Sequence, residues 1–539
     1  MGYKNKKTSI YLPILLSVIL VAGIYFGIHL ERAKVSGYNP QYFQITKLNG
    51  ILNFVEAEYV DSVDLKNLEE AAIPAMLSQL DPHSIYIPAL DVARVNEPLE
   101  GNFEGIGVSF NMPDDTIVII SVIPRGPSEK VGILAGDRIV KIEDEIVAGL
   151  NINSDDIVKK LKGPRGTKVI IGVKRKSVDE ILYFTITRDK IPLYSVDVSY
   201  MANDSTGFIK ISKFARTTYN EFMDALEDLK SKGMTQLILD LRGNSGGYLD
   251  AATNIANQFL PEGALIVYTE GRAHGRENTL TNGAGKFQKG KILILINEWS
   301  ASASEIIAGA IQDNDRGIIM GRRSFGKGLV QEPLVLNDGS MIRLTIARYY
   351  TPTGRCIQKS YSNGNDDYYQ DLHSRYINGE FMEADSIQFA DSLKFVTPGG
   401  KVVYGGGGIM PDVFVSIDTI GITNYFRQVR NKGLMYRFAF EYVDKNRDKL
   451  IEYTNAEIIE AFLDSQNLLS SFVDYASENG VPKNAQDLLE SKHIIHTEIK
   501  AYIARNMIDN KGFYPIWNNI DYTFNQAIEY LSMESFNNQ

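Results

Sequence analysis

The residues best suited to chemistry lie in a Ser-Ala-Ser-Ala-Ser-Glu stretch at 300–305. The stretch follows an apolar run at 291–297, which predicts a strand buried on both faces, and it precedes a predicted helix at 306–312. The first N–H groups of a helix have no intrahelical partner and carry the positive end of the helix dipole, so they can bind a developing anion. A serine hydroxyl beside such donors is half of a site for acyl transfer.

A lysine that could activate a serine follows 25 residues after Ser302. Lys327 lies between Gly326 and Gly328, and these glycines let other backbone or a substrate approach closely. The plain alternative is a Ser/Ala-rich helix start followed by a solvated lysine in a turn, which is the better interpretation of either piece alone. The two pieces together favour a catalytic pair.

The two pieces resemble the carboxyl-terminal processing proteases, or tail-specific proteases, which are serine endopeptidases with a Ser/Lys dyad. The resemblance rests on the 300–305 turn and, at the family's spacing, on Phe-Gly-Lys-Gly at 325–328 with a glutamine four residues after the lysine. It implies that Ser302 is the nucleophile, Lys327 the general base and Gln331 an orienting partner of the lysine.

A second glycine turn completes this resemblance. Asp-Leu-Arg-Gly-Asn-Ser-Gly-Gly at 240–247 is similar to the family's Asp-Leu-Arg-Asn-Asn-x-Gly-Gly and departs from it at Gly243, where the family usually has Asn or another polar residue. The resemblance implies that the N–H groups of Gly247 and Ala303 form the oxyanion hole, with Gly246 as the alternative to Gly247. Without the serine motif this turn would be ordinary scaffolding of a parallel sheet.

Such a mechanism requires a lysine that is neutral near neutral pH. Free lysine has a pKa of about 10.4, and lowering it to about 7 to 8 means disfavouring the charged form by roughly 3 to 5 kcal/mol, which burial without a carboxylate partner can do. We therefore expect Glu305, which is close in sequence, to point away from the site.

The same region contains a partial match to a phosphate-binding loop. Residues 321–327 fit the first seven positions of a Walker A loop, but Gly328 occupies the eighth, where Ser or Thr must coordinate Mg²⁺. The following 330–335 segment favours a strand rather than a helix. These two departures argue against an ATPase.

The elements expected to position these residues alternate between strand and helix. Strands are predicted at 207–211, 236–240 and 291–297, with an amphipathic helix at 219–232 between the first two. With the family resemblance, this pattern predicts an α/β protease core with a crotonase-like α/β/α sheet. The polar 360–400 segment is expected to be an insertion.

A second module is predicted between residues 96 and 190, where short alternating strands and Gly-rich turns resemble a PDZ domain. The strand that begins Gly105-Ile106-Gly107-Val108 would be the edge that pairs with an extended peptide, and N–H groups of the loop before it would hold a terminal carboxylate. A helix at 154–161 would form the other wall of the groove. The alternative is a small structural barrel that binds nothing.

The N-terminus predicts export. Lys4, Lys6 and Lys7 precede 10–30, a segment with no charged side chain apart from a possible one at His29, and about 20 apolar residues suffice to cross a bilayer as a helix. We interpret 10–30 as a signal anchor in the inner membrane, with the basic 1–9 tail in the cytoplasm and the catalytic part on the periplasmic side. A cleaved signal peptide is the rival interpretation.

Composition excludes several other classes of protein. A net charge of -10 with no long basic block argues against nucleic acid as a partner. The single cysteine, Cys356, rules out an intramolecular disulfide or a thiolate metal cage. His493 and His496 lack ligands at suitable spacing and are expected to be a surface pair, so neither a metal nor a cofactor is predicted.

His83, in the Leu-Asp-Pro-His-Ser loop at 80–84, is expected to be a loop residue rather than a catalytic one.

The remaining segments are predicted to be helical, one before the PDZ-like module and one after the protease core. The expected organisation is a basic tail, an anchor, an N-terminal helical segment, a PDZ domain, a protease core and a helical extension at 1–9, 10–30, 41–95, 96–190, 191–418 and 419–539.

The resemblance predicts a serine endopeptidase that recognises exported, unfolded or tail-exposed proteins by their C-termini. The alternative is an exported PDZ scaffold that binds peptides and carries a vestigial protease site. The intact Ser302, Lys327 and Gln331 weigh against this alternative.

Overall fold

The computed structural model describes residues 16–25, 47–176, 178–387 and 390–533, in two compact units of residues 1–76 and 77–539. The first unit contains a helix at 16–25, helix α2 (Lys47–Glu58) and most of helix α3 (Leu65–Leu77). Among the described helices, none combines the length and apolarity that crossing a membrane requires. The predicted anchor at 10–30 lies outside the described residues except for 16–25.

The second unit is built around a six-stranded sheet in the order β10-β11-β12-β15-β16-β21, in which only β10 runs antiparallel to its neighbour. The strands are β10 (Val196–Met201), β11 (Thr206–Ile211), β12 (Gln236–Asp240), β15 (Lys291–Ile296), β16 (Ile318–Gly321) and β21 (Val413–Phe414). The three strands predicted from sequence are therefore confirmed, and β12 and β15 lie side by side. Their carboxyl ends deliver the two predicted catalytic turns to the same edge of the sheet.

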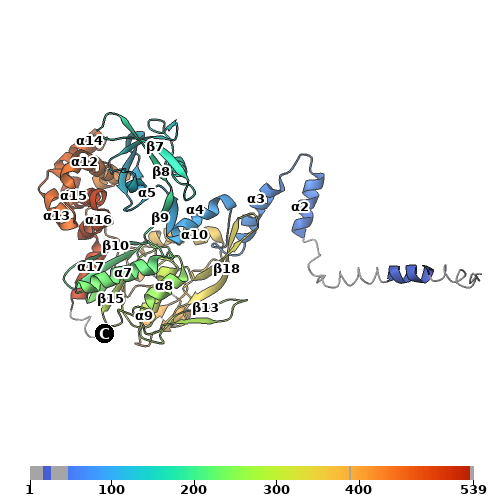
Figure 1. Ribbon diagram of the computed structural model, residues 1–539. Coiled ribbons are helices and arrows are strands. Elements are labelled where there is room, and N and C mark those ends of the chain that lie inside the picture. Colours follow the sequence, from blue (N-terminus) through green and yellow to red (C-terminus); the bar gives the residue numbers. More distant parts are fainter. Residues whose placement is uncertain (1–15, 26–46, 177, 388–389, 534–539) are drawn as a thin grey trace, which may run out of the picture. The chain divides into compact units, whose positions relative to one another are not determined.

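Strand β15 shows why this sheet is covered on both faces. Its isoleucines at 292, 294 and 296 pack into one buried cluster, whereas Leu293 and Leu295 pack into another, because successive side chains of a strand point to opposite faces. Helices α7 (Thr218–Ser231), α8 (Leu249–Ala256) and α9 (Ala303–Asp313) contribute to the first cluster. These three helices cover the first face of the sheet (Figure 1).

The second face of the sheet is covered by a helix from the far end of the chain. Helix α17 (Tyr522–Ser532) places Phe524 and Leu531 in the cluster that contains Leu293 and Leu295. Its N-cap residue, Asp521, accepts two hydrogen bonds from Arg242, at 2.9 and 2.8 Å. The C-terminal extension is thus helical as predicted, and its last helix is a layer of the protease core.

A second sheet lies next to the site and contains β1 (Ile85–Ile87), β13 (Leu265–Glu270), β14 (Glu277–Leu280), β17 (Leu329–Val335) and β18 (Met341–Tyr350). Strand β17 pairs antiparallel with β18, and it begins two residues after Lys327. Gln331 therefore has a fixed place on a strand rather than in the preceding turn.

The PDZ-like module has a sheet in the order β3-β4-β5-β7-β8, with β6 paired to β5. Its elements are β3 (Val108–Asn111), η2 (Pro113–Asp115), β4 (Ile117–Val122), α5 (Pro127–Lys130), β5 (Arg138–Ile142), β6 (Glu145–Ile146), α6 (Ser154–Leu161), β7 (Lys168–Lys174) and β8 (Ile181–Thr187). The helix at 154–161 is confirmed at both ends. The module is entered and left through a ribbon in which β2 (Asn102–Gly105) pairs with β9 (Asp189–Pro192).

One expectation for this module needs correction. Gly105 belongs to β2 and pairs with β9, and the edge strand β3 begins only at Val108. The chain turns between them because Gly107 has a φ of +76°, a conformation that favours glycine. Ile106 is buried in the core of the module and does not face a groove.

The helices before and after these domains complete the described chain. Helix α4 (Ala89–Glu100) precedes the PDZ-like module. The predicted insertion contains α10 (Asn365–Ile377), η3 (Ala384–Ser386), η4 (Asp391–Leu393) and β19 (Lys394–Val396), and β19 pairs with β20 (Val402–Tyr404). The extension contains α11 (Asn424–Asn431), α12 (Leu434–Leu450), α13 (Ala456–Asp464), α14 (Leu468–Glu478), α15 (Ala485–Ile508), α16 (Asn510–Trp517) and η5 (Asn518–Ile520), with a core of its own.

Candidate active site

Ser302 occupies a strained position between β15 and α9. It is the N-cap residue of α9, with φ 55° and ψ -114°, a conformation that costs a non-glycine residue about 1–3 kcal/mol. The other two serines of the turn are fully buried, and their hydroxyls donate to backbone carbonyls: Ser300 to Leu241 and Ser304 to Asn244, both at 2.8 Å. The side chain of Ser302 remains partly accessible, so the structure distinguishes it from its two neighbours.

Two N–H groups beside Ser302 are available for an anion. Within the described residues, neither Gly247 N nor Ala303 N donates a hydrogen bond, whereas Gly246 N donates to Asn244 Oδ1 at 2.9 Å. Gly246 is nevertheless required for close packing, because a Cβ there would lie 2.8 Å from Ser302 Cβ. Within the described residues, the N–H groups of Gly247 and Ala303 thus have no partner, whereas that of Gly246 has one, and the assignment of the oxyanion hole stays a prediction.

Lys327 lies in a half-buried position with an amide as its partner. Its Nζ donates to Gln331 Oε1 at 3.0 Å, and Gln331 Nε2 in turn donates to the backbone carbonyl of His83. Burial lowers the pKa of Lys327, and the nearby charge of Arg343 lowers it further, against smaller opposing effects of Glu305 and Asp81. The described contacts include neither an ion pair of Lys327 nor a direct hydrogen bond between Lys327 Nζ and Ser302 Oγ; catalytic hydrogen bonds are often long before substrate binds.

The expectation that Glu305 points away is wrong. Its buried carboxylate accepts from Ser302 N and Lys327 N through Oε2, at 2.8 and 2.9 Å, and from Gly326 N and Ser324 Oγ through Oε1, at 2.7 and 2.5 Å. Burial raises its pKa to about 7, and the four donors oppose this rise. Glu305 thus connects the serine turn to the lysine turn through their backbones without pairing with the lysine amine.

A buried tyrosine connects the same two turns from the other side. The hydroxyl of Tyr349, on β18, contacts the backbone carbonyls of Ser302, at 3.1 Å, and of Lys327. Burial holds the pKa of this phenol well above its usual range, so it stays protonated and can donate. Sequence analysis did not single out Tyr349, because a tyrosine in a strand carries no local sign of what its hydroxyl reaches.

His83 contributes to the site through its main chain and through a ring that contacts Tyr368. Its carbonyl receives Gln331, and its Nε2 lies 2.7 Å from the hydroxyl of Tyr368. Burial and the charge of Lys327 lower the pKa of His83 to about 4, so the ring is neutral near neutral pH. The described contacts do not join this ring to Ser302. The prediction that His83 is a loop residue agrees with this geometry.

The PDZ-like module presents an open strand edge. Strand β3 lies at the end of its sheet, and Ile106 N and Gly107 N, just before it, donate no hydrogen bond within the described chain. Two successive free N–H groups at the start of an edge strand can bind a carboxylate.

Models of three protein families match parts of this chain, and a known protein is similar to much of it. A model described as peptidase family S41 matches residues 205–365, a PDZ domain model matches residues 105–185, and a model of a family of unknown function matches residues 425–509. A carboxy-terminal-processing protease of Bartonella bacilliformis is 36% identical over 350 residues, which cover 63% of this chain and 80% of that protein.

Two further proteins are similar. The carboxy-terminal processing protease CtpB of Bacillus subtilis is 33% identical over 354 residues, which cover 63% of this chain and 72% of that protein. Among solved structures, a photosystem II D1 C-terminal processing protease aligns with a TM-score of 0.35 and 24% identity, over 68% of this chain and 91% of that one.

Proposed function

Since this chain belongs to the carboxy-terminal processing proteases of peptidase family S41 and carries a PDZ domain, we propose that it hydrolyses peptide bonds with a dyad of Ser302 and Lys327. The observation that carries this proposal is the serine turn. Its two flanking hydroxyls are buried and bonded, whereas Ser302 is partly accessible and lies next to Ala303 and against the Gly246–Gly247 turn. Within the described residues, neither the Ala303 nor the Gly247 N–H group donates a hydrogen bond.

In the first half of the reaction, Ser302 Oγ attacks the carbonyl carbon of the scissile bond. Neutral Lys327 accepts the hydroxyl proton, and the N–H groups of Gly247 and Ala303 bind the oxyanion that forms. The tetrahedral intermediate collapses as Lys327 returns the proton to the leaving amine. This step releases the C-terminal fragment and leaves an ester on Ser302.

The second half of the reaction restores the enzyme. A water molecule takes the place of the leaving amine, Lys327 accepts one of its protons, and the hydroxide attacks the ester. Collapse of the second intermediate returns the proton to Ser302 Oγ and releases the N-terminal fragment as an acid. Gln331 holds the lysine amine throughout without carrying a charge that would raise its pKa.

The direct test is cleavage of an unfolded protein by the purified chain and by its Ser302→Ala variant. Activity in the first and none in the second supports Ser302 as the nucleophile of the dyad. Equal inactivity of both under all conditions would instead favour a PDZ scaffold with a vestigial site.

Substrates are proposed to be recognised by their free C-termini through the PDZ domain. The open edge of β3 can add a peptide strand, and the N–H groups of Ile106 and Gly107, followed by Val108, can receive its terminal carboxylate and last side chain. Gly105 lies in the β2–β9 ribbon and not in the edge strand. Its proposed contribution is therefore to shape the loop that leads from β2 into β3.

This proposal predicts that a substrate ending in free Ala or Val is cleaved with a roughly ten- to hundredfold higher kcat/KM than the same substrate amidated, the range expected for charge-assisted hydrogen bonds. A substrate ending in Asp-Asp keeps the terminal carboxylate but has no apolar last side chain, and it should also be cleaved more slowly. The assay compares intact enzyme with a variant lacking residues 96–190. Equal cleavage of the pair by intact enzyme would refute tail recognition. A preference that survives the deletion would place recognition outside the PDZ domain.

The enzyme is further proposed to act outside the cytoplasm, held to the inner membrane by residues 10–30. This proposal rests on the apolar segment and the lysines before it. The expected result is that the chain sediments with membranes and that protease added to spheroplasts degrades its catalytic part. A soluble exported form that begins near residue 24 would show that the segment is a cleaved signal peptide.

A further inference from the structure

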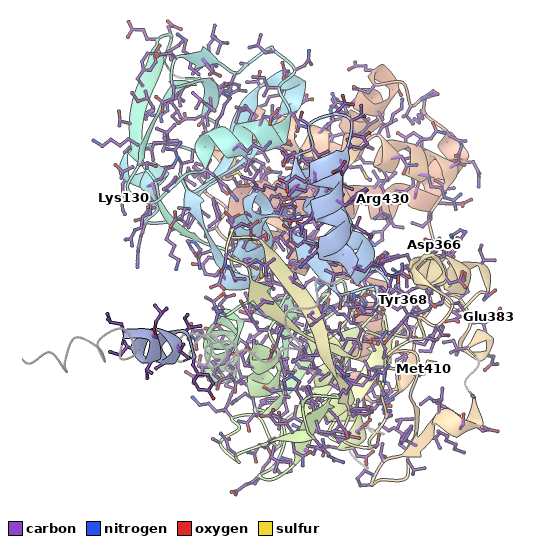
Figure 2. All side chains as sticks on the ribbon, turned by 90° about the vertical axis from the view of Figure 1, so that its right-hand side faces the viewer. Lys130, Asp366, Tyr368, Glu383, Met410 and Arg430 are labelled. Atoms are coloured by element: carbon purple, nitrogen blue, oxygen red, sulfur yellow. The ribbon has the colours of Figure 1, made fainter. Side chains whose placement is uncertain are left out.

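Helix α10 lies outside the part of the chain that matches the S41 family model, which ends at residue 365, where the helix begins. Its exposed side carries Asp366, whereas Tyr368 is 2% exposed (both labelled in Figure 2). The buried side of this helix contacts two segments that surround Lys327, and both sets of contacts are formed by side chains.

The first segment is the loop at 78–84. The hydroxyl of Tyr368 lies 2.7 Å from His83 Nε2, and the two rings pack edge to face with centroids 5.3 Å apart. The hydroxyl of Tyr369 donates to the carbonyl of Pro82 at 2.8 Å, and the amide of Asn365 donates to the carbonyl of Ser78 at 3.0 Å. One turn of α10 thus makes three hydrogen bonds with this loop.

The second segment is the turn that carries the lysine. Arg375, 3% exposed, donates to the carbonyls of Ser324 and Arg323 at 3.1 and 2.7 Å. The amine of Lys359 lies 4.1 Å from the ring centroids of both Phe325 and Tyr368 and donates to the Tyr368 carbonyl at 3.0 Å. The helix is therefore held against the turn by buried, charged contacts, which fix geometry more strictly than apolar packing does.

Three hydrogen bonds, joined by the covalent frame of His83 and by the side-chain amide of Gln331, lead from α10 to the amine of Lys327. The Tyr368 hydroxyl binds the His83 ring, the carbonyl of the same histidine receives Gln331 Nε2, and Gln331 Oε1 accepts from Lys327 Nζ. An amide side chain can rotate about its last bond, so the direction of Gln331 Oε1 depends on what its nitrogen binds. The position of the His83 carbonyl therefore determines where the lysine amine is held.

We propose that Tyr368 is a positioning residue for the catalytic lysine, which it orients through His83 and Gln331. The proposal rests on the proposed function of Lys327 as general base. A helix that continues beyond the matched S41 region would then help to position the catalytic lysine.

The test is the Tyr368→Phe variant, which keeps the buried ring and removes only the hydroxyl. Loss of one neutral hydrogen bond predicts a roughly three- to tenfold lower kcat, with KM for an unfolded substrate unchanged. Tyr376→Phe is the matched control, because Tyr376 is on the same helix, is 56% exposed and should leave kcat at the wild-type value. Rates are measured well below the unfolding temperature of each variant.

A double-mutant cycle examines the route through the histidine. His83→Ala removes the ring but keeps the carbonyl that Gln331 binds, so it should lower kcat by a similar factor. Adding Tyr368→Phe to it should cause no further loss. If the fold-losses in kcat of the two single variants multiplied in the double variant, the proposal would be overturned. A Tyr368→Phe variant as active as Tyr376→Phe would also overturn it. Failure of the dyad itself is distinguishable, because Ser302→Ala and Lys327→Ala would then retain activity.

Discussion

The kcat of the Ser302→Ala variant is expected to be at least about 10³-fold lower than that of the wild type, because without the hydroxyl no ester intermediate can form. The fold should be retained, since the buried hydroxyls of Ser300 and Ser304 and the carboxylate of Glu305 still hold the turn. The strained backbone at φ 55° is set by neighbours, including the Glu305 carboxylate at the Ser302 N–H group. Cleavage of an unfolded protein, with circular dichroism of both forms, provides the measurement.

Ser300→Ala and Ser304→Ala are the matched controls for this result. Their hydroxyls donate to the carbonyls of Leu241 and Asn244, and the Ser300 hydroxyl also accepts from Asn297 N. Each replacement should therefore lower the free energy of unfolding by about 1–3 kcal/mol and leave most of the cleavage activity. If Ser304→Ala lost all activity while Ser302→Ala kept it, the nucleophile would be Ser304 instead.

The Lys327→Arg variant is expected to be as inactive as Lys327→Ala. A guanidinium stays protonated at any usable pH and cannot accept the proton of Ser302. Positive charge alone therefore cannot replace the lysine. An arginine variant with measurable turnover would refute the role of general base.

The pH dependence of the wild-type rate tests the same role. Burial lowers the pKa of Lys327, and the neutral amine is the active form, so kcat/KM should rise as pH increases through this lowered pKa and level off above it. Glu305 has a pKa raised to about 7, and its ionised form accepts the four donors that hold the two turns. Its negative charge also raises the pKa of Lys327, so ionisation of Glu305 moves the rise in rate toward higher pH. A rate that does not change between about pH 6 and 9 would contradict the mechanism.

The sequence was sufficient to predict the strands and turns that carry the residues of the site. The 291–296 run alternates between two buried clusters, which requires a strand covered on both faces, and the serines follow directly at its carboxyl end. The 236–240 strand and the glycine turn after it are likewise predicted from the pattern of a short segment. These features are readable because period, turn residues and spacing are properties of short segments.

The sequence failed where a side chain's direction mattered. Glu305 was expected to avoid the site because a carboxylate near Lys327 would raise the lysine's pKa. Folding instead directs the carboxylate to four backbone and hydroxyl donors, where it stabilises both turns. Proximity along the chain gives no information on which donors a buried oxygen will meet.

By itself, the sequence determined the local elements, the family and the types of residue available for catalysis. Only the tertiary structure decided which of three serines is accessible. It also decided, within the described residues, which N–H groups donate no hydrogen bond and that the half-buried Lys327 makes no ion pair. It also brought Tyr349 to the two turns of the site and Tyr368 to His83, and it placed α17 on the second face of the sheet. The physical reason is that burial and hydrogen-bond partners are set by contacts between segments far apart in sequence, whereas periodicity and turn chemistry are local.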